Sequence, residues 1–202
     1  MARPAAPIQP QALARLHLAA AQEFGALGLE HASLNRILAA SGMAKSSFYH
    51  RYQGKRALYD ELIARVHGVV ERALSQLDSD VTSAEEFWGS ACRAVAELEQ
   101  AATDHPELAT AAALLYRADA AAELSGLRRD LADKLRRRLA QGQQLGAVRT
   151  DLPLSLLTDL TVAMMLALDA WTLQRAGESG SDENRAAVAS TLNVIRDLVS
   201  GD

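Results

Sequence analysis

The stretch that decides the fold is Gly28–Leu58, which reads GLEHASLNRILAASGMAKSSFYHRYQGKRAL. Ser33 stands at a helix N-cap position, because its hydroxyl can accept a hydrogen bond from the first turn of the apolar segment that follows. Gly42 supplies the positive φ that a tight turn requires, and Met43 can fill the inside of that corner. Two short helices joined by a sharp turn are therefore predicted, as in a helix-turn-helix.

The second of these helices has two different faces. Ala44, Phe48 and Tyr52 lie four residues apart and are predicted to face inward. The opposite face is polar, as a helix that enters the major groove of DNA requires. Phosphate contacts are expected mainly from Ser33, Arg36, Lys45, Tyr49 and Lys55. Base-edge contacts are expected from Ser46, Ser47 and His50.

The charge of the chain is unevenly distributed. The net charge is -4, which by itself disfavours a nucleic-acid partner. Residues 1–65, however, hold 8 Lys and Arg against 4 Asp and Glu, a net charge of +4, so that residues 66–202 carry -8. A basic head on an acidic body indicates a protein that contacts an anion with one end only.

The rest of the chain has helical periodicity and no alternating strand pattern. A first helix carries Leu13 to Leu27 on one face and is expected to stop at Gly28. A long helix is predicted from about Lys55 to Leu77. Further helices are predicted at 83–103, 106–117, 120–142, 152–177 and 183–200.

The segment Gly28–Leu58 resembles the signature of the tetracycline-repressor (TetR) family of regulators. The resemblance rests on Gly28, Ser33, Ala40–Gly42, Lys45, Phe48–His50, Tyr52 and Lys55. The chain departs from the family pattern at Ala44, where a capping Ser is common, and at Ser46, where a glycine is common. The missing side-chain cap weakens the recognition helix by about 1 kcal/mol if nothing replaces it.

The resemblance implies an all-α fold of about nine helices. A three-helix DNA-binding domain at 10–54 would be joined by the long helix to an effector-binding and dimerisation domain at 55–202. A homodimer would form through the helices at 152–177 and 183–200. The first has an apolar stripe of Leu157, Leu160, Met164, Leu168 and Trp171. The second has an apolar stripe of Val188, Leu192, Ile195 and Val199.

Six residues are candidates for a ligand pocket, because such cavities combine aromatic walls with few polar groups. They are Trp88, Cys92, Tyr116, Met164, Met165 and Trp171. Ordinary core packing explains the same residues, and nothing among them indicates a chemical class of ligand. His105 is better explained as a cap or turn residue, and the run Arg136–Arg138 as a solvated helix face.

Several other classes of protein are disfavoured. The sequence has no metal-ligand spacing, no nucleophile elbow and no Gly-rich phosphate loop after a strand, so neither an enzyme nor a cofactor is expected. Cys92 is the only cysteine, which favours a buried thiol in a reducing cytoplasm. Met1–Pro10 does not resemble a signal peptide, and the longest unbroken apolar run, Val162–Leu168, is too short for a membrane span.

The sequence therefore predicts a cytoplasmic, homodimeric repressor that binds a pseudo-palindromic operator in double-stranded DNA and is released by a small-molecule effector. Two alternatives stay open. The first is a helical ligand-binding protein or enzyme without sequence-specific DNA binding. The second is a family member that activates transcription, or that binds a protein in place of a small effector.

Overall fold

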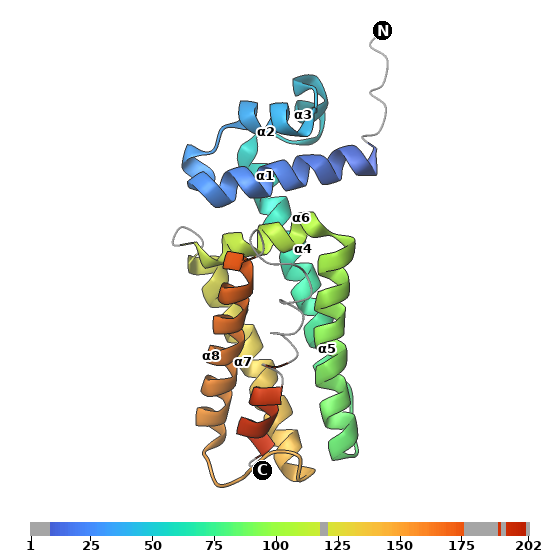
Figure 1. The fold of residues 1–202 in the computed structure, drawn as a ribbon, viewed down its shortest axis with the longest axis vertical. Coiled ribbons are helices and arrows are strands. Elements are labelled where there is room, and N and C mark those ends of the chain that lie inside the picture. The colour runs from blue at the N-terminus through green and yellow to red at the C-terminus, as the bar shows by residue number, and fades with distance from the viewer. Residues whose placement is uncertain (1–8, 118–120, 176–189, 191–192, 201–202) are drawn as a thin grey trace. The chain divides into compact units, whose positions relative to one another are not determined.

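The structure is built from helices. The computed structural model describes residues 9–117, 121–175, 190 and 193–200, and within these every regular element is helical (Figure 1). In chain order they are α1 (Pro10–His31), α2 (Leu34–Ser41), α3 (Lys45–Arg51), α4 (Lys55–Ser75), η1 (Gln76–Asp78), α5 (Ala84–Asp104), α6 (Pro106–Ala112), η2 (Ala113–Tyr116), α7 (Ala121–Gln144) and α8 (Leu154–Arg175). Residues 193–200 are also helical, and the predicted all-α fold of about nine helices is confirmed over the described residues.

The helix-turn-helix forms where the sequence signals place it. Ser33 is the N-cap of α2, and its Oγ accepts a hydrogen bond from the Arg36 backbone N–H at 3.4 Å. Gly42 ends α2 in the left-handed region with a φ of 68°, a conformation that costs glycine nothing because it has no Cβ. The Met43 N–H then bonds the Leu38 carbonyl at 3.2 Å, which closes the turn.

The first helix differs from the prediction at its C-terminal end. Gly28 has a φ of 72° and a ψ of 169°, so the helical path is broken at this glycine as expected. The chain resumes a short helical stretch as far as His31, and the Ala32 N–H bonds the Gly28 carbonyl. Gly28 is thus a kink followed by one more turn, which positions the chain for the N-cap of α2.

The chain divides into two compact units by its internal contacts. The first unit contains Met1–Val69 and Gln100–Ala121, and the second contains Val70–Glu99 and Ala122–Asp202. The α6–η2 segment belongs to the first unit because it packs against α1. The predicted domains at 10–54 and 55–202 are defined by their binding roles, whereas these two units are defined by packing. Helices α4 and α5 each contribute residues to both units.

The first unit has an apolar core under the helix-turn-helix. Phe48 of α3 is fully buried, and Tyr52 at the end of α3 is buried as well. The two rings stack with centroids 5.2 Å apart. Ala44 was predicted to face inward with them, but it is exposed because it is the N-cap residue, one position before α3 begins. Further fully buried side chains are Leu16, Phe24, Ile37, Leu58 and Leu62.

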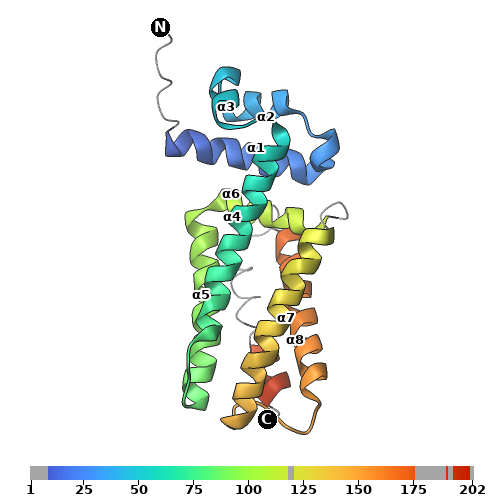
Figure 2. The same cartoon turned by 180° about the vertical axis from the view of Figure 1, so that it is seen from behind.

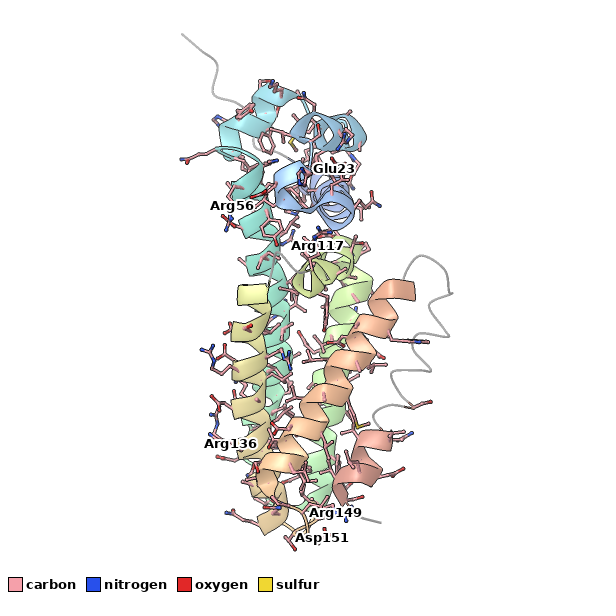
Figure 3. All side chains as sticks on the ribbon, turned by 90° about the vertical axis from the view of Figure 1, so that its left-hand side faces the viewer. Glu23, Arg56, Arg117, Arg136, Arg149 and Asp151 are labelled. Atoms are coloured by element: carbon pink, nitrogen blue, oxygen red, sulfur yellow. The ribbon has the colours of Figure 1, made fainter. Side chains whose placement is uncertain are left out.

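The second unit is a helical bundle in which α5, α7 and α8 run side by side (Figures 1 and 2). One core cluster centres on Phe87, Leu139, Leu157 and Val199, and a second joins Leu74, Leu131, Leu135 and Val162. Arg149 and Asp151 form an ion pair in the turn between α7 and α8 (Figure 3).

One arginine of the run predicted to be solvated is buried. Arg136 and Arg137 are exposed, whereas Arg138 lies inside the second unit. Its guanidinium donates to the carbonyl of Ser79 at 2.9 Å and to the hydroxyl of Ser90, and it lies over the Phe87 ring. Burial lowers the pKa of this guanidinium. The prediction of a solvated helix face was wrong for Arg138, because the side of α7 that bears this residue packs against α5.

Helix α8 leaves much of its apolar surface uncovered in a single chain. Leu154–Thr172 has a mean hydropathy of 1.4 and is long and apolar enough to cross a membrane by length and composition alone, and 22 % of it is buried inside the structure. Leu156 and Leu160 are among its exposed side chains. In the last helix, Ile195 and Val199 pack into the chain's own core while Val194 is exposed; Val188 and Leu192 lie outside the described residues.

Candidate nucleic-acid interface

Helix α3 presents a polar face that is anchored from behind. Phe48 is fully buried, and the Tyr49 ring meets it edge to face with centroids 5.3 Å apart. Lys45, Ser46, Tyr49 and His50 are exposed, and Ser47 is half-buried. Tyr49 exposes 51 % of its surface, which is unusual for a large aromatic side chain and marks it as available for contact. The structure therefore brings together the five residues that the sequence assigned to this face.

The first turn of α3 has no side-chain cap. Ala44 is the N-cap and makes no side-chain hydrogen bond, as predicted from its missing hydroxyl. Its carbonyl accepts the Phe48 N–H at 3.1 Å, so the helix itself is regular from its first residue. The N–H groups of the first turn are left for solvent or for an anion.

Glu23 on α1 fixes the start of α2, and sequence reasoning missed it. Its Oε1 accepts the backbone N–H of Ser33 at 2.7 Å and the Arg36 Nε at 2.9 Å (Figure 3). The hydrogen bond from Arg36 is the main cause of the lowered pKa of the Glu23 carboxyl. Because Arg36 is held by this carboxylate, its guanidinium is placed in advance at the edge of the helix-turn-helix. A lone Glu on a helix that precedes the motif by ten residues gives no local signal of this contact.

Lys55 binds backbone carbonyls of its own chain. Its Nζ donates to the carbonyl of Glu30 at 2.7 Å and to that of Ala32 at 2.9 Å. The ammonium group therefore ties the start of α4 to the chain that leaves α1. An ammonium group has three donors, so one remains for the phosphate contact that the sequence predicts.

A buried polar cluster lies behind α3 and was also missed. His17 of α1 is fully buried, and its Nε2 lies 3.1 Å from the Tyr52 hydroxyl. Its Nδ1 contacts the Arg65 guanidinium, which also donates to the nearly buried carboxylate of Glu107 on α6 at 3.2 Å. Burial is the main reason that the pKa of His17 falls from 6.5 to about 4, and the charge of Arg65 adds to it.

Glu61 and Arg51 complete this cluster. Glu61 of α4 accepts a hydrogen bond from Arg51 at 3.1 Å, and its Oε1 lies 3.4 Å from the His17 Nε2. The Arg51 Nε donates to the Tyr52 hydroxyl at 3.1 Å. Burial raises the pKa of the Tyr52 phenol, so it remains a neutral hydroxyl. The cluster thus joins α1, the end of α3, α4 and α6 by hydrogen bonds.

The six candidate pocket residues are only partly brought together. Trp88, Met164 and Met165 pack against the same core cluster of the second unit. Cys92 is exposed, so the predicted buried thiol was wrong; it lies on a face of α5 that points away from the core. Tyr116 ends η2 in the first unit, and Trp171 is half-buried near the end of α8. Their role in binding a ligand stays a prediction.

Comparison with known proteins gives concordant results. A family model described as "Bacterial regulatory proteins, tetR family" matches residues 18–62. An HTH-type transcriptional regulator of Bacillus subtilis, YdgC, is 28% identical over 152 residues, which cover 75% of each chain.

Two solved structures show the same fold at low identity. A TetR-like transcriptional regulator from Rhodococcus sp. RHA1 superposes with a TM-score of 0.66 at 18% identity and covers 96% of each chain. The regulator FadR from Bacillus subtilis, solved in complex with stearoyl-CoA, has a TM-score of 0.61 at 15% identity and covers 93% of this chain and 98% of its own. Both matches extend well beyond the helix-turn-helix.

Proposed function

We propose that this chain is a repressor of the TetR family, which binds a pseudo-palindromic operator as a homodimer and releases it when a small-molecule effector binds. The chain is a transcription regulator and not an enzyme. One observation carries the proposal: α3 exposes Lys45, Ser46, Tyr49 and His50 together on a helix that is anchored by the fully buried Phe48.

The roles of the side chains on this surface follow from their chemistry. Lys45 and Tyr49 bind phosphates, and Ser46, Ser47 and His50 reach base edges in the major groove. Ser33 and Arg36 contact phosphate at the start of α2, where Glu23 holds the guanidinium in place. Lys55 contributes its remaining donor to a phosphate while it anchors α4.

The uncovered face of α8 supports the homodimer. Leu156 and Leu160 are exposed one turn apart on this helix, and Val194 on the last helix is exposed as well. Exposed apolar side chains that gather into one patch mark an interface with a second chain or a membrane. A second copy is the better match, because two-fold symmetry of the protein would mirror a palindromic operator with half-sites one helical turn apart.

The proposed effector site lies in the second unit. The FadR relative was solved with stearoyl-CoA, which shows that a protein of this fold accommodates a small molecule. In this chain Trp88, Met164 and Met165, which share one apolar cluster, are the best-supported part of the predicted pocket, with Cys92, Tyr116 and Trp171 as further candidates. Binding is expected to take place in the cytoplasm, where operator and metabolites are both accessible.

The test is capture of fragmented genomic DNA by the purified protein at about 0.15 M salt, since ionic strength sets how much non-specific binding survives. Recovery of a few palindromic sites is the expected result. The matched variants are Lys45→Ala and Arg137→Ala, each of which removes one exposed positive charge.

Only the change in α3 should abolish capture, because Arg137 lies on α7 in the second unit. If the wild-type protein recovers no site above background, or if both variants lose capture equally, the DNA-binding proposal fails. In that case the alternative of a helical ligand-binding protein gains support.

A further inference from the structure

The buried polar cluster of the first unit links α6 to the end of α3 through side-chain contacts. We infer that Glu107 of α6 is a positioning residue for the recognition helix and sets the place of α3 through Arg65, His17 and Tyr52 in turn. The inference rests on the proposed function for its DNA readout alone; its structural readout is independent of DNA.

The contacts form a continuous chain from α6 to α3. The Glu107 carboxylate accepts from the Arg65 Nη2 at 3.2 Å, and the Nη1 of the same guanidinium contacts the His17 Nδ1. The His17 Nε2 lies 3.1 Å from the Tyr52 hydroxyl. Tyr52 ends α3, since its backbone N–H bonds the Phe48 carbonyl at 2.9 Å and its ring stacks on that of Phe48. A shift of Glu107 is therefore conveyed to the residue that anchors α3.

The direction of each hydrogen bond is determined by chemistry. A guanidinium only donates, so the His17 Nδ1 that faces Arg65 must be an acceptor. The neutral imidazole then carries its hydrogen on Nε2 and donates it to the Tyr52 hydroxyl. A hydrogen on both nitrogens would oppose the guanidinium, which agrees with the pKa of His17 near 4. The chain of contacts is thus held in a single arrangement at neutral pH.

Glu61 offers the imidazole a competing acceptor. Its Oε1 lies 3.4 Å from the His17 Nε2, only slightly farther than the Tyr52 hydroxyl. When Arg65 holds the ring, the shorter contact to Tyr52 is favoured. When Arg65 loses Glu107, the ring is free to turn toward Glu61, and Tyr52 loses the contact that links it to α1. The imidazole therefore has two acceptors within reach, Tyr52 and Glu61, and its contact with Arg65 favours Tyr52.

Both ends of the α6–η2 segment are attached to the same unit. Glu107 lies at its start, with the His105 Nδ1 3.5 Å from the carboxylate. At its other end the Arg117 guanidinium donates to the Gly25 carbonyl of α1 at 2.6 Å (Figure 3). A displacement of this segment therefore changes its contacts with α1 and, through the cluster, with α3. Arg65 is half-buried and Glu107 is nearly buried. Desolvation makes such an ion pair less stabilising than apolar packing of the same volume. What the ion pair adds is a fixed geometry between α4 and α6.

The experiment compares Glu107→Leu with Glu107→Gln. Leucine removes the acceptor at similar volume, and glutamine keeps an oxygen that accepts from Arg65, so glutamine is the conservative variant. The matched control is Glu71→Leu on the exposed surface of α4, which makes the same chemical change outside the cluster. Amide hydrogen exchange of the DNA-free protein is measured for α1, α2 and α3 separately.

The expected result is local. In Glu107→Leu the amides of α3 and Tyr52 exchange about tenfold faster relative to those of α1 and α2, since a lost hydrogen bond of a charged group has an effect of that order. Glu107→Gln restores most of the protection, and Glu71→Leu leaves it unchanged. If all three helices lose protection in proportion, or if α3 is unaffected, Glu107 has only a structural role and the inference is overturned. Should Glu107→Leu fail to fold, Glu107→Gln is decisive: its smaller loss of amide protection must again fall on α3 and not on α1 and α2.

A second readout uses the operator fragment recovered above. A misplaced α3 loses its base contacts, whereas the phosphate contacts of Ser33, Arg36 and Lys55 outside α3 persist. Glu107→Leu is therefore expected to weaken operator binding about tenfold and binding to random-sequence DNA much less. An equal loss for both DNAs contradicts positioning. Absence of operator binding by the wild-type protein defeats the proposed function and leaves the exchange experiment to decide on Glu107.

Discussion

The buried imidazole of His17 should dominate the loss of stability in mild acid. The side chain is fully buried, and its pKa is about 4 in the folded protein against 6.5 in the unfolded chain. The folded state therefore favours the neutral ring. Its contribution is fully present above pH 6.5 and is lost as the pH falls toward 4, because the unfolded chain takes up a proton that the folded protein does not.

The magnitude follows from the two pKa values. A difference of about 2.5 units amounts to about 3 kcal/mol once both states are protonated. At pH 5 the unfolded imidazole is almost fully charged and the folded one almost fully neutral, so about 2 kcal/mol is already lost. The carboxyl groups Glu23, Glu86 and Asp151, whose pKa values are lowered, contribute mainly below that pH.

The assay is urea unfolding between pH 7 and pH 5 at a fixed protein concentration, since dimerisation would make stability depend on concentration. Wild type should lose about 2 kcal/mol more than His17→Gln over this range, although the variant starts less stable. His50→Gln, which removes an exposed imidazole, should follow the wild-type curve. Parallel curves for wild type and His17→Gln would refute the reasoning, because they would mean that His17 is not held neutral.

Three further predictions concern packing, DNA binding and assembly. Gly142→Ala should destabilise the protein by about 1–3 kcal/mol in urea unfolding, because an added Cβ would overlap Val148 and lie 2.7 Å from Phe87, and an unchanged midpoint would contradict this packing. Lys45→Ala should reduce the slope of log affinity against log salt concentration by about 0.9, measured by fluorescence anisotropy on the operator fragment, and an unchanged slope would exclude a phosphate contact. Leu160→Glu should convert the proposed dimer to monomers in light scattering, and a dimer that persists would place the interface elsewhere.

The sequence predicted those features of the head that depend on residues near one another in the chain. Ser33 caps the helix that begins one residue later, and Gly42 adopts the positive φ that its turn needs. Phe48 is buried as its spacing indicates. The family resemblance extended this to the all-helical fold of the remaining chain, which propensity alone leaves undetermined in topology.

The features that were missed join residues far apart in the chain. The contacts of His17 with Tyr52 and Arg65 span 35 and 48 residues, and that of Arg65 with Glu107 spans 42. Periodicity assigns each of these residues to a helix face but says nothing about which charged groups meet. Cys92 illustrates the opposite error, since cysteine is commonly buried and this one is exposed on α5.

These long-range contacts change how the basic head should be understood. Most described cations between residues 9 and 65 are committed to partners within the chain. The ion pairs are Arg36 with Glu23, Arg51 with Glu61, Arg56 with Asp60 and Arg65 with Glu107. Lys55 is bound to two carbonyls, and the Arg15 Nε points at the carbonyl of Ser41. In the described part of the head, Lys45 is thus the cation with no such contact.

The net charge of the head therefore overstates the charge that DNA meets. A paired guanidinium still attracts phosphate, but its carboxylate partner offsets much of that attraction at short range. Lys45 stands at the first position of α3, where the free N–H groups of the helix end add to its attraction for an anion. The attraction of the head for a phosphate is then strongest at α3 itself. We therefore expect α3, the helix that carries this cation, to orient the protein in the proposed contact with DNA.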